Sequence, residues 1–312
     1  MSDLTLRSLY PEDIHQVSEI ESALAGNSRI FFLEKRLAAA SAIPENFITC
    51  AVTDSKRLAG YGFARVLEGE FGSKSAIAVL DTIGVASEYQ SRGIGKMVLS
   101  GIERRMKNRN IPVIQTQTLW SRYAMIRFFA ATGFSMATGQ IIERDTSPLI
   151  ADTARVPAEI VVRSLKGTDI SAINKIDSKL TGLDRSAYFA SKFMEMLDDS
   201  GVRVSMVAEH QGGISGYIMA RIDYGEFGQV EKAAVIDTIG VHPDFAGSGV
   251  GNELLFQLLL KLSSLQVELV RTKVEHENSD LRIFLSRRGF KPSQRLILTK
   301  EIRQLTPPSS FK

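Results

Sequence analysis

Two glycine-bearing loops carry the residues best suited to chemistry in this sequence. They run Gln90-Ser91-Arg92-Gly93-Ile94-Gly95-Lys96 and Ala246-Gly247-Ser248-Gly249-Val250-Gly251-Asn252, and each leads into a helical pattern. Alternate glycines let successive backbone N–H groups approach a ligand without obstruction by side chains. The positive end of the helix dipole lies at the same point and favours an anion. We therefore predict that these loops bind a diphosphate; a tight turn without a ligand is the alternative.

Acidic and phenolic side chains precede each loop. Asp81 and Asp237 lie within otherwise apolar strand patterns, where burial favours the protonated carboxyl group and makes it a candidate base. The alternative is a carboxylate that accepts hydrogen bonds from a neighbouring loop. The glutamates of a repeated Gly-Glu-Phe-Gly are second candidates, and a hairpin turn is the alternative role. Two strand tyrosines are candidate proton donors, and a ring packed in the core is the alternative. These further candidate catalytic residues are Glu70, Glu226, Tyr61 and Tyr217.

Candidate substrate contacts come from a segment after the first helix of each half. Arg29 ends Gly26-Asn27-Ser28-Arg29 and Arg185 ends the matching Gly182-Leu183-Asp184-Arg185. A guanidinium there is suited to a bidentate contact with a carboxylate; the alternative is an ion pair with a nearby acid. Trp120 stands where the second half has His276, which indicates that the two sites differ. Since Glu275-His276-Glu277 is explained more simply as a strand end or loop, we predict no metal.

Two other phosphate-binding motifs fit this sequence less well. A dinucleotide fingerprint needs Gly-x-Gly-x-x-Gly close to the first strand of a parallel unit and an acid about 20 residues later. Here the first loop follows several predicted strands, and residues 100–119 contain no strand that ends in an acid at that distance. A P-loop is excluded because no Gly-Lys-Ser/Thr follows either loop.

One shift along the chain relates the two loops and their neighbours. Asp81-Thr82-Ile83-Gly84-Val85 recurs as Asp237-Thr238-Ile239-Gly240-Val241, a displacement of 237 − 81 = 156 residues. The same displacement relates Gly133-Phe134 to Gly289-Phe290. Stacked small repeats recur at about 20 to 50 residues, so this shift indicates two copies of a whole domain. Each copy must contain the elements that position one loop.

Those elements read as a mixed α/β unit. In the first copy, strand patterns cover residues 47–52, 58–64 and 76–83, and a helical pattern covers 96–106 after the loop. The corresponding helix of the second copy has an apolar face that we expect in the core, formed by Leu254, Leu255, Leu258, Leu259 and Leu262. Prolines and small polar residues between the copies indicate a connector, so we place the domains at residues 1–146 and 158–304.

The composition excludes several classes of protein. The 312 residues include 38 basic and 35 acidic side chains, and this balance lacks the basic footprint of a nucleic-acid binder. The single cysteine, Cys50, excludes an internal disulfide and indicates a reducing compartment. No segment is long and apolar enough to cross a bilayer, and the N-terminal residues do not read as a signal peptide. We therefore expect a cytoplasmic protein that binds neither nucleic acid nor membrane.

The pattern of these motifs resembles the GNAT superfamily of acetyl-CoA-dependent N-acetyltransferases. The resemblance rests on Leu80-Asp81-Thr82-Ile83-Gly84-Val85, the loop from Gln90 to Gly95, and Gly133-Phe134, and it extends over both copies. In the second copy Ala246 stands where the family has Gln or Arg. The chain thus resembles a tandem GNAT protein. This resemblance implies two domains, each with a mixed, mostly antiparallel sheet flanked by helices and a central pair of splayed parallel strands.

The same resemblance implies how acetyl-CoA binds. The strand segments Ile83, Gly84, Val85 and Ile239, Gly240, Val241 would pair with the pantetheine arm. The pyrophosphate would lie on Ser91, Arg92, Gly93, Ile94, Gly95 and Lys96, after Gln90, and on Gly247, Ser248, Gly249, Val250, Gly251 and Asn252. The family often has a tyrosine proton donor four residues before the Gly-Phe, but Phe129 and Leu285 stand there in this chain.

The resemblance implies an acyltransferase that acts on an amine of a small molecule or peptide by direct attack, with at least one active domain. Two alternatives remain: a non-catalytic acyl-CoA sensor or interaction module, and a chain with one active and one structural copy. Duplication also favours a pseudo-two-fold arrangement of the two domains, either as a monomer with pseudo-dimeric domains or as a homodimer.

Overall fold

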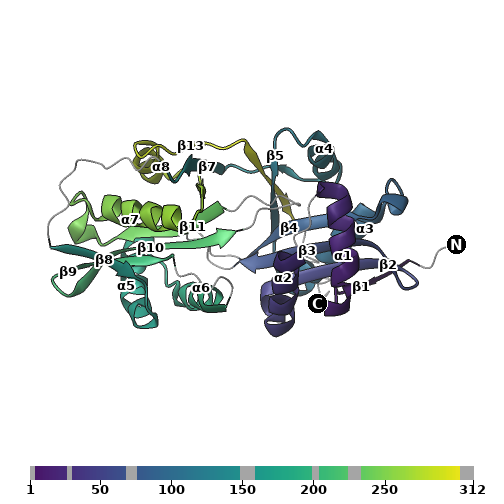
Figure 1. Cartoon of the computed structure of the whole chain (residues 1–312), viewed down its shortest axis with the longest axis horizontal. Helices are drawn as coiled ribbons and strands as arrows, with labels where there is room; N and C mark the ends of the chain where they lie inside the picture. Colours follow the sequence, from purple (N-terminus) through teal and green to yellow (C-terminus); the bar gives the residue numbers. More distant parts are fainter. Residues whose placement is uncertain are drawn as a thin grey trace, which may run out of the picture.

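A computed structural model of the chain describes residues 4–26, 30–67, 76–147, 159–198, 204–223 and 233–302. These residues form two mixed sheets of seven strands each, flanked by helices (Figure 1). The two sheets lie side by side along the long axis of the molecule. Over the same residues, no helix combines the length and the apolar character needed to cross a membrane.

The N-terminal half alternates strands and helices in the predicted order. Its helices are α1 (Ile14–Ala25), α2 (Ile30–Ala42), α3 (Ile94–Asn108) and α4 (Tyr123–Ala131). Its strands are β1 (Leu4–Arg7), β2 (Phe47–Asp54), β3 (Arg57–Leu67), β4 (Ile77–Val85), β5 (Val113–Leu119), β6 (Ser135–Met136) and β7 (Gln140–Asp145).

The C-terminal half repeats this order. Its helices are α5 (Ile170–Thr181), α6 (Ser186–Asp198), α7 (Val250–Ser264) and α8 (Ser279–Ser286). Its strands are β8 (Ile160–Ser164), β9 (Met206–His210), β10 (Gly213–Asp223), β11 (Ala233–Val241), β12 (Leu269–Val274), β13 (Lys291–Pro292) and β14 (Arg295–Glu301).

The two halves exchange their last long strands. The strand orders are β1-β2-β3-β4-β5-β14-β6 and β13-β7-β12-β11-β10-β9-β8. β14 pairs antiparallel with β5, and β7 pairs antiparallel with β12; the yellow strand β14 lies beside β5 in Figure 1. The proposed domains 1–146 and 158–304 therefore describe the sequence repeat, whereas each sheet also contains a strand from the other half.

Helices cover both faces of each sheet. In the C-terminal half α7 packs its predicted apolar face on the sheet, and all five leucines of that face are buried. The opposite face carries α5 and α6 through a second apolar cluster that includes Ile173, Ile176 and Phe189. The N-terminal half has the same two clusters, one with α3 and one with α1 and α2. Each sheet is thus fixed from both sides, which gives the loops at its edge a rigid support.

A central parallel pair stops pairing part-way along each sheet. β4 pairs with β5 from Ile77 to Val79, and β11 pairs with β12 from Ala233 to Val235. Just beyond the paired residues, a threonine side chain makes the hydrogen bond between the two strands in place of a backbone N–H. Thr116 Oγ1 donates to the Leu80 carbonyl, and Thr272 Oγ1 donates to the Ile236 carbonyl, both at 2.9 Å. The expected splayed parallel pair is confirmed in both halves.

Candidate functional site

Each Asp-Thr-Ile-Gly-Val segment contains a β-bulge at its aspartate. In the ladder between β3 and β4, Phe63 is opposite Thr82 and Ala64 is opposite Leu80, so Asp81 is the extra residue. The ladder between β10 and β11 skips Asp237 in the same way. A bulge bends its strand and re-aims the side chain of the extra residue.

The bulged aspartates are held in ion pairs. Arg65 Nε and Nη2 donate to the two carboxylate oxygens of Asp81 at 2.7 and 2.8 Å, and both side chains are buried. Asp237 pairs with Arg221 in the other half, one repeat further on (221 − 65 = 156). A bidentate guanidinium engages both oxygens and stabilises the ionised form. This arrangement favours the hydrogen-bonded alternative over the predicted role of Asp81 and Asp237 as bases.

The glycine of each segment accommodates a tyrosine ring. Tyr61 lies opposite Gly84 in the ladder, and Tyr217 lies opposite Gly240. A Cβ atom on Gly84 would lie 2.5 Å from Cε1 of Tyr61, and one on Gly240 would lie 2.6 Å from Cε1 of Tyr217. Both tyrosines are 1% exposed. Their rings thus belong to the cores under α1 and α5, as the structural alternative predicts.

The two loops have the backbone that an anion site needs. Gly93 and Gly249 are the residues before α3 and α7 and have φ of +81° and +89°. A Cβ atom on Gly93, or on Gly247 in the second loop, would meet no atom within 4 Å, so there is open space beside each loop. The first N–H groups of a helix have no partner within the helix. This backbone is compatible with the predicted diphosphate site, which stays a prediction.

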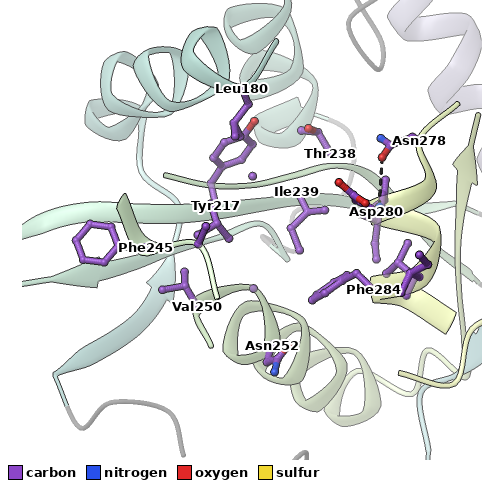
Figure 2. Close-up of a pocket in the computed structure, with 18 of the residues that line it drawn as sticks. Leu180, Tyr217, Thr238, Ile239, Phe245, Val250, Asn252, Asn278, Asp280 and Phe284 are labelled. Atoms are coloured by element: carbon purple, nitrogen blue, oxygen red, sulfur yellow. Dashed lines mark hydrogen bonds between the residues drawn. The ribbon is translucent and has the colours of Figure 1, made fainter. Parts of the chain in front are cut away.

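A cavity of about 1080 Å³ connects the second loop with the interior of the C-terminal half. Figure 2 shows Val250, Asn252 and Phe284 at one end, Ile239 between, and Leu180 with the Tyr217 side chain at the other end. The predicted cofactor residues Ile239–Val241 and Gly247–Asn252 all line this cavity. The structure thus brings the predicted strand segment and loop of this half together around one space.

A buried polar cluster forms the inner end of the cavity. Asp177 Oδ1 accepts hydrogen bonds from the Tyr217 hydroxyl at 2.7 Å and from Arg185 Nη1 at 2.9 Å. The Arg185 guanidinium also lies 4.3 Å from the Tyr188 ring centroid and 5.3 Å from that of Phe189. Arg185 lines the cavity, but its side chain is 5% exposed and ion-paired. This favours a role in positioning Asp177 over a direct clamp on a carboxylate.

Burial, together with the negative charge of Asp177, raises the pKa of the Tyr217 phenol far above its usual range. The hydroxyl consequently stays protonated at neutral pH and acts as a hydrogen-bond donor. This favours Tyr217 as a hydrogen-bond donor that positions Asp177, while its predicted role as a proton donor in catalysis stays a prediction.

Sequence reasoning missed Asp177, although a signal was present. Asp177 follows Ile173 by four residues and Ile176 by one, so it lies on the buried face of α5. A carboxylate at such a position needs partners, and Arg185 and Tyr217 supply them. Other missed lining residues come from β11 and from the segment around α8, namely Thr238, Asn278, Asp280, Phe284, Arg287 and Arg288.

The remaining predicted residues do not gather at this cavity. Trp120 directly follows β5 and has a half-exposed side chain, and its backbone N–H donates to the Gln294 carbonyl at 3.0 Å. Glu70, Glu226 and Arg29 lie outside the described residues. Phe129 and Leu285, which replace the family tyrosine, are buried in the cores. Among the described residues, no group of three or more His, Cys, Asp and Glu side chains is placed to hold a metal ion.

The sequence matches the acetyltransferase (GNAT) family over residues 14–134 and again over residues 173–290. The two matches cover more than half of the chain, so this protein belongs to the GNAT family. Because both copies match, it is a tandem member, in agreement with the prediction. No curated protein matches the chain.

Solved structures have the same fold over nearly the whole chain. A tandem GNAT protein from the clavulanic acid biosynthesis pathway has a TM-score of 0.70 and 17% identity, with 97% of this chain and 100% of that chain covered. A GCN5-related N-acetyltransferase from Sphaerobacter thermophilus has a TM-score of 0.63 and 17% identity, with 96% of each chain covered. At this level of identity the likeness shows the fold alone.

Proposed function

We propose that this protein is an acetyl-CoA-dependent N-acetyltransferase for an amine of a small molecule or peptide, and that its C-terminal half contains a working site. The observation that carries the proposal is the cavity that joins the loop Ala246–Asn252 to the polar cluster of Asp177 and Tyr217. A diphosphate on the loop and a pantetheine arm along Ile239–Val241 would direct the thioester toward that cluster. Family membership supports the same activity.

Acetyl-CoA supplies an activated acyl group: the amine nitrogen forms a bond to the carbonyl carbon, the C–S bond breaks, and the thiol leaves with a proton. The amine must first lose a proton, so a carboxylate near it is useful. Asp177 Oδ2 makes a long contact of 3.5 Å with Thr181 Oγ1 and retains capacity to accept a hydrogen bond. We assign the contact with the acceptor amine to Asp177.

A non-catalytic acyl-CoA sensor is the second candidate. It is favoured by Phe129 and Leu285, because neither supplies the proton that a departing thiolate takes up. A chain with one active and one structural copy is a variant of the first proposal. Binding stoichiometry and turnover distinguish these possibilities.

Calorimetric titration of the full chain with acetyl-CoA tests the cofactor assignment. We expect two equivalents to bind, one lost in Gly93→Trp and the other in Gly249→Trp, since a side chain on Gly93 meets open space and Gly249 lines the cavity. A panel of amines with detection of free thiol then tests turnover. Binding without release of thiol by any amine favours the sensor; unchanged binding in both variants contradicts the loop assignment.

The predicted cellular setting remains part of this proposal. We expect a reducing, cytoplasmic compartment, because Cys50 is a free, buried thiol. Strand exchange between the halves supports a monomer that is a pseudo-dimer within one chain.

A further inference from the structure

We infer that the two cofactor sites take their positive charge from different elements. In the N-terminal half the charge comes from the loop itself, through Arg92 and Lys96. In the C-terminal half Arg287 and Arg288, at the end of α8, bind the phosphate groups of coenzyme A. This inference rests on the function proposed above.

The sequence repeat supplies the first observation. A shift of 156 residues places Ser248 at the position of Arg92 (92 + 156 = 248) and Asn252 at the position of Lys96 (96 + 156 = 252). The second loop has therefore lost both cations. Conversely, Arg287 and Arg288 correspond to Ala131 and Thr132 in the first half, whose side chains are neutral (287 − 156 = 131; 288 − 156 = 132).

The structure places the replacement cations at the same ligand space. Arg287 and Arg288 both line the cavity, together with the loop residues Gly247–Asn252. Arg288 Nη2 donates to Asn252 Oδ1, in the first turn of α7. Its guanidinium lies 4.2 Å from the Phe284 ring centroid, and that ring is the neighbour that a Cβ atom on Gly251 would meet at 3.4 Å. The α8 arginine is thus anchored directly at the predicted diphosphate site.

A third guanidinium fixes this end of α8. Arg144, on the exchanged strand β7, is buried and donates through Nη1 to the Arg288 carbonyl at 2.5 Å. Two arginines, Arg287 and Arg288, therefore line the cavity beside the positive end of the α7 dipole, and Arg144 holds the backbone that carries them. Such a concentration of like charge favours a polyanion. Coenzyme A offers its diphosphate and its 3′-phosphate to this region.

The test uses the full chain with Gly93→Trp, so that coenzyme A titrates the C-terminal site alone. We expect Arg287→Gln and Arg288→Gln each to raise Kd about tenfold, as loss of one charge-assisted hydrogen bond requires, and to weaken the salt dependence of binding. Arg282→Gln is the matched control, because Arg282 lies on α8 but does not line the cavity. In the Gly249→Trp background, Arg92→Gln and Lys96→Gln should instead raise Kd.

A rescue variant distinguishes loss of positive charge from a disturbance of the local structure. Ser248→Arg places a cation in the second loop and should recover most of the affinity that Arg287→Gln removes. Dephospho-coenzyme A identifies the phosphate involved: if the arginine variants weaken it as much as coenzyme A, the contact is with the diphosphate, and if they do not, it is with the 3′-phosphate.

Two results would overturn the inference in distinguishable ways. One equivalent of coenzyme A bound with unchanged Kd in both arginine variants would leave the proposed function intact and remove the role of α8. No binding at all in the Gly93→Trp chain, with its circular dichroism spectrum unchanged, would remove the cofactor site of the C-terminal half together with this inference.

Discussion

At the scale of single residues, the aspartates of the two repeated segments illustrate how a chemical signature can have a structural cause. An acid in an apolar strand suggested a base, but Arg65 and Arg221 engage Asp81 and Asp237 in ion pairs. The arginines lie on the neighbouring strand, where Arg65 is opposite Val79 and Arg221 is opposite Val235. Each is therefore opposite the residue two positions before the bulged aspartate. The pairs hold the bulge and thereby the strand segment that follows it.

Removal of one partner should therefore destabilise the fold before it alters chemistry. Arg65→Met leaves a buried carboxylate without its cation, and we expect a loss of about 3 to 5 kcal/mol in the free energy of unfolding. Arg65→Met combined with Asp81→Leu should recover much of this loss, because neither charge then remains. Chemical denaturation of the three chains measures the effect. A stable Asp81→Asn chain that has lost turnover would instead support Asp81 as the base.

At the scale of secondary-structure elements, local patterns predicted most of what was found. The strand expected at residues 76–83 is Ile77–Val85, and the helix expected at 96–106 is Ile94–Asn108. Helix and strand periodicity and the glycines before a helix are local signals, so the loops followed from them. The splayed parallel strands were expected only from the resemblance to the GNAT superfamily. The ion pairs of Asp177 with Arg185 and of Arg65 with Asp81 form only once the fold has made their elements neighbours. The local pattern of a single sequence does not show which elements will pack together.

The close approach of Tyr217 to Gly240 gives a prediction at this scale. Gly240→Ala would place a Cβ atom 2.6 Å from Cε1 and 2.9 Å from Oη of Tyr217. The ring or the strand must then shift, and we expect a cost of about 1 to 3 kcal/mol from overpacking. Thermal unfolding measures it, with Gly240→Ala in a Tyr217→Leu chain as the matched control that removes the clash. A Gly240→Ala chain with unchanged Tm would show that the ring does not constrain this position.

At the scale of the whole molecule, strand exchange makes the two halves interdependent. Leu298 of β14 belongs to the core of the N-terminal half, and Ile142 of β7 belongs to the core of the C-terminal half. These two residues are equivalent in the repeat (298 − 142 = 156). The sequence did not predict the exchange, because a strand has the same alternation of apolar residues whichever sheet receives it.

The exchange predicts crossed effects of two matched substitutions. Leu298→Ala should destabilise the N-terminal sheet, and Ile142→Ala the C-terminal sheet, each by about 2 to 5 kcal/mol, since each removes a buried side chain from the opposite half. Hydrogen exchange resolves the two effects: Leu298→Ala should lower amide protection in β4 and β5, and Ile142→Ala should lower it in β11 and β12. If each substitution instead lowered protection in the sheet of its own sequence half, the strands would not be exchanged in solution. Because β7 also contributes Arg144, which donates to the carbonyl of the cavity-lining Arg288, Ile142→Ala should weaken coenzyme A binding at that site, although the altered residue belongs to the other repeat.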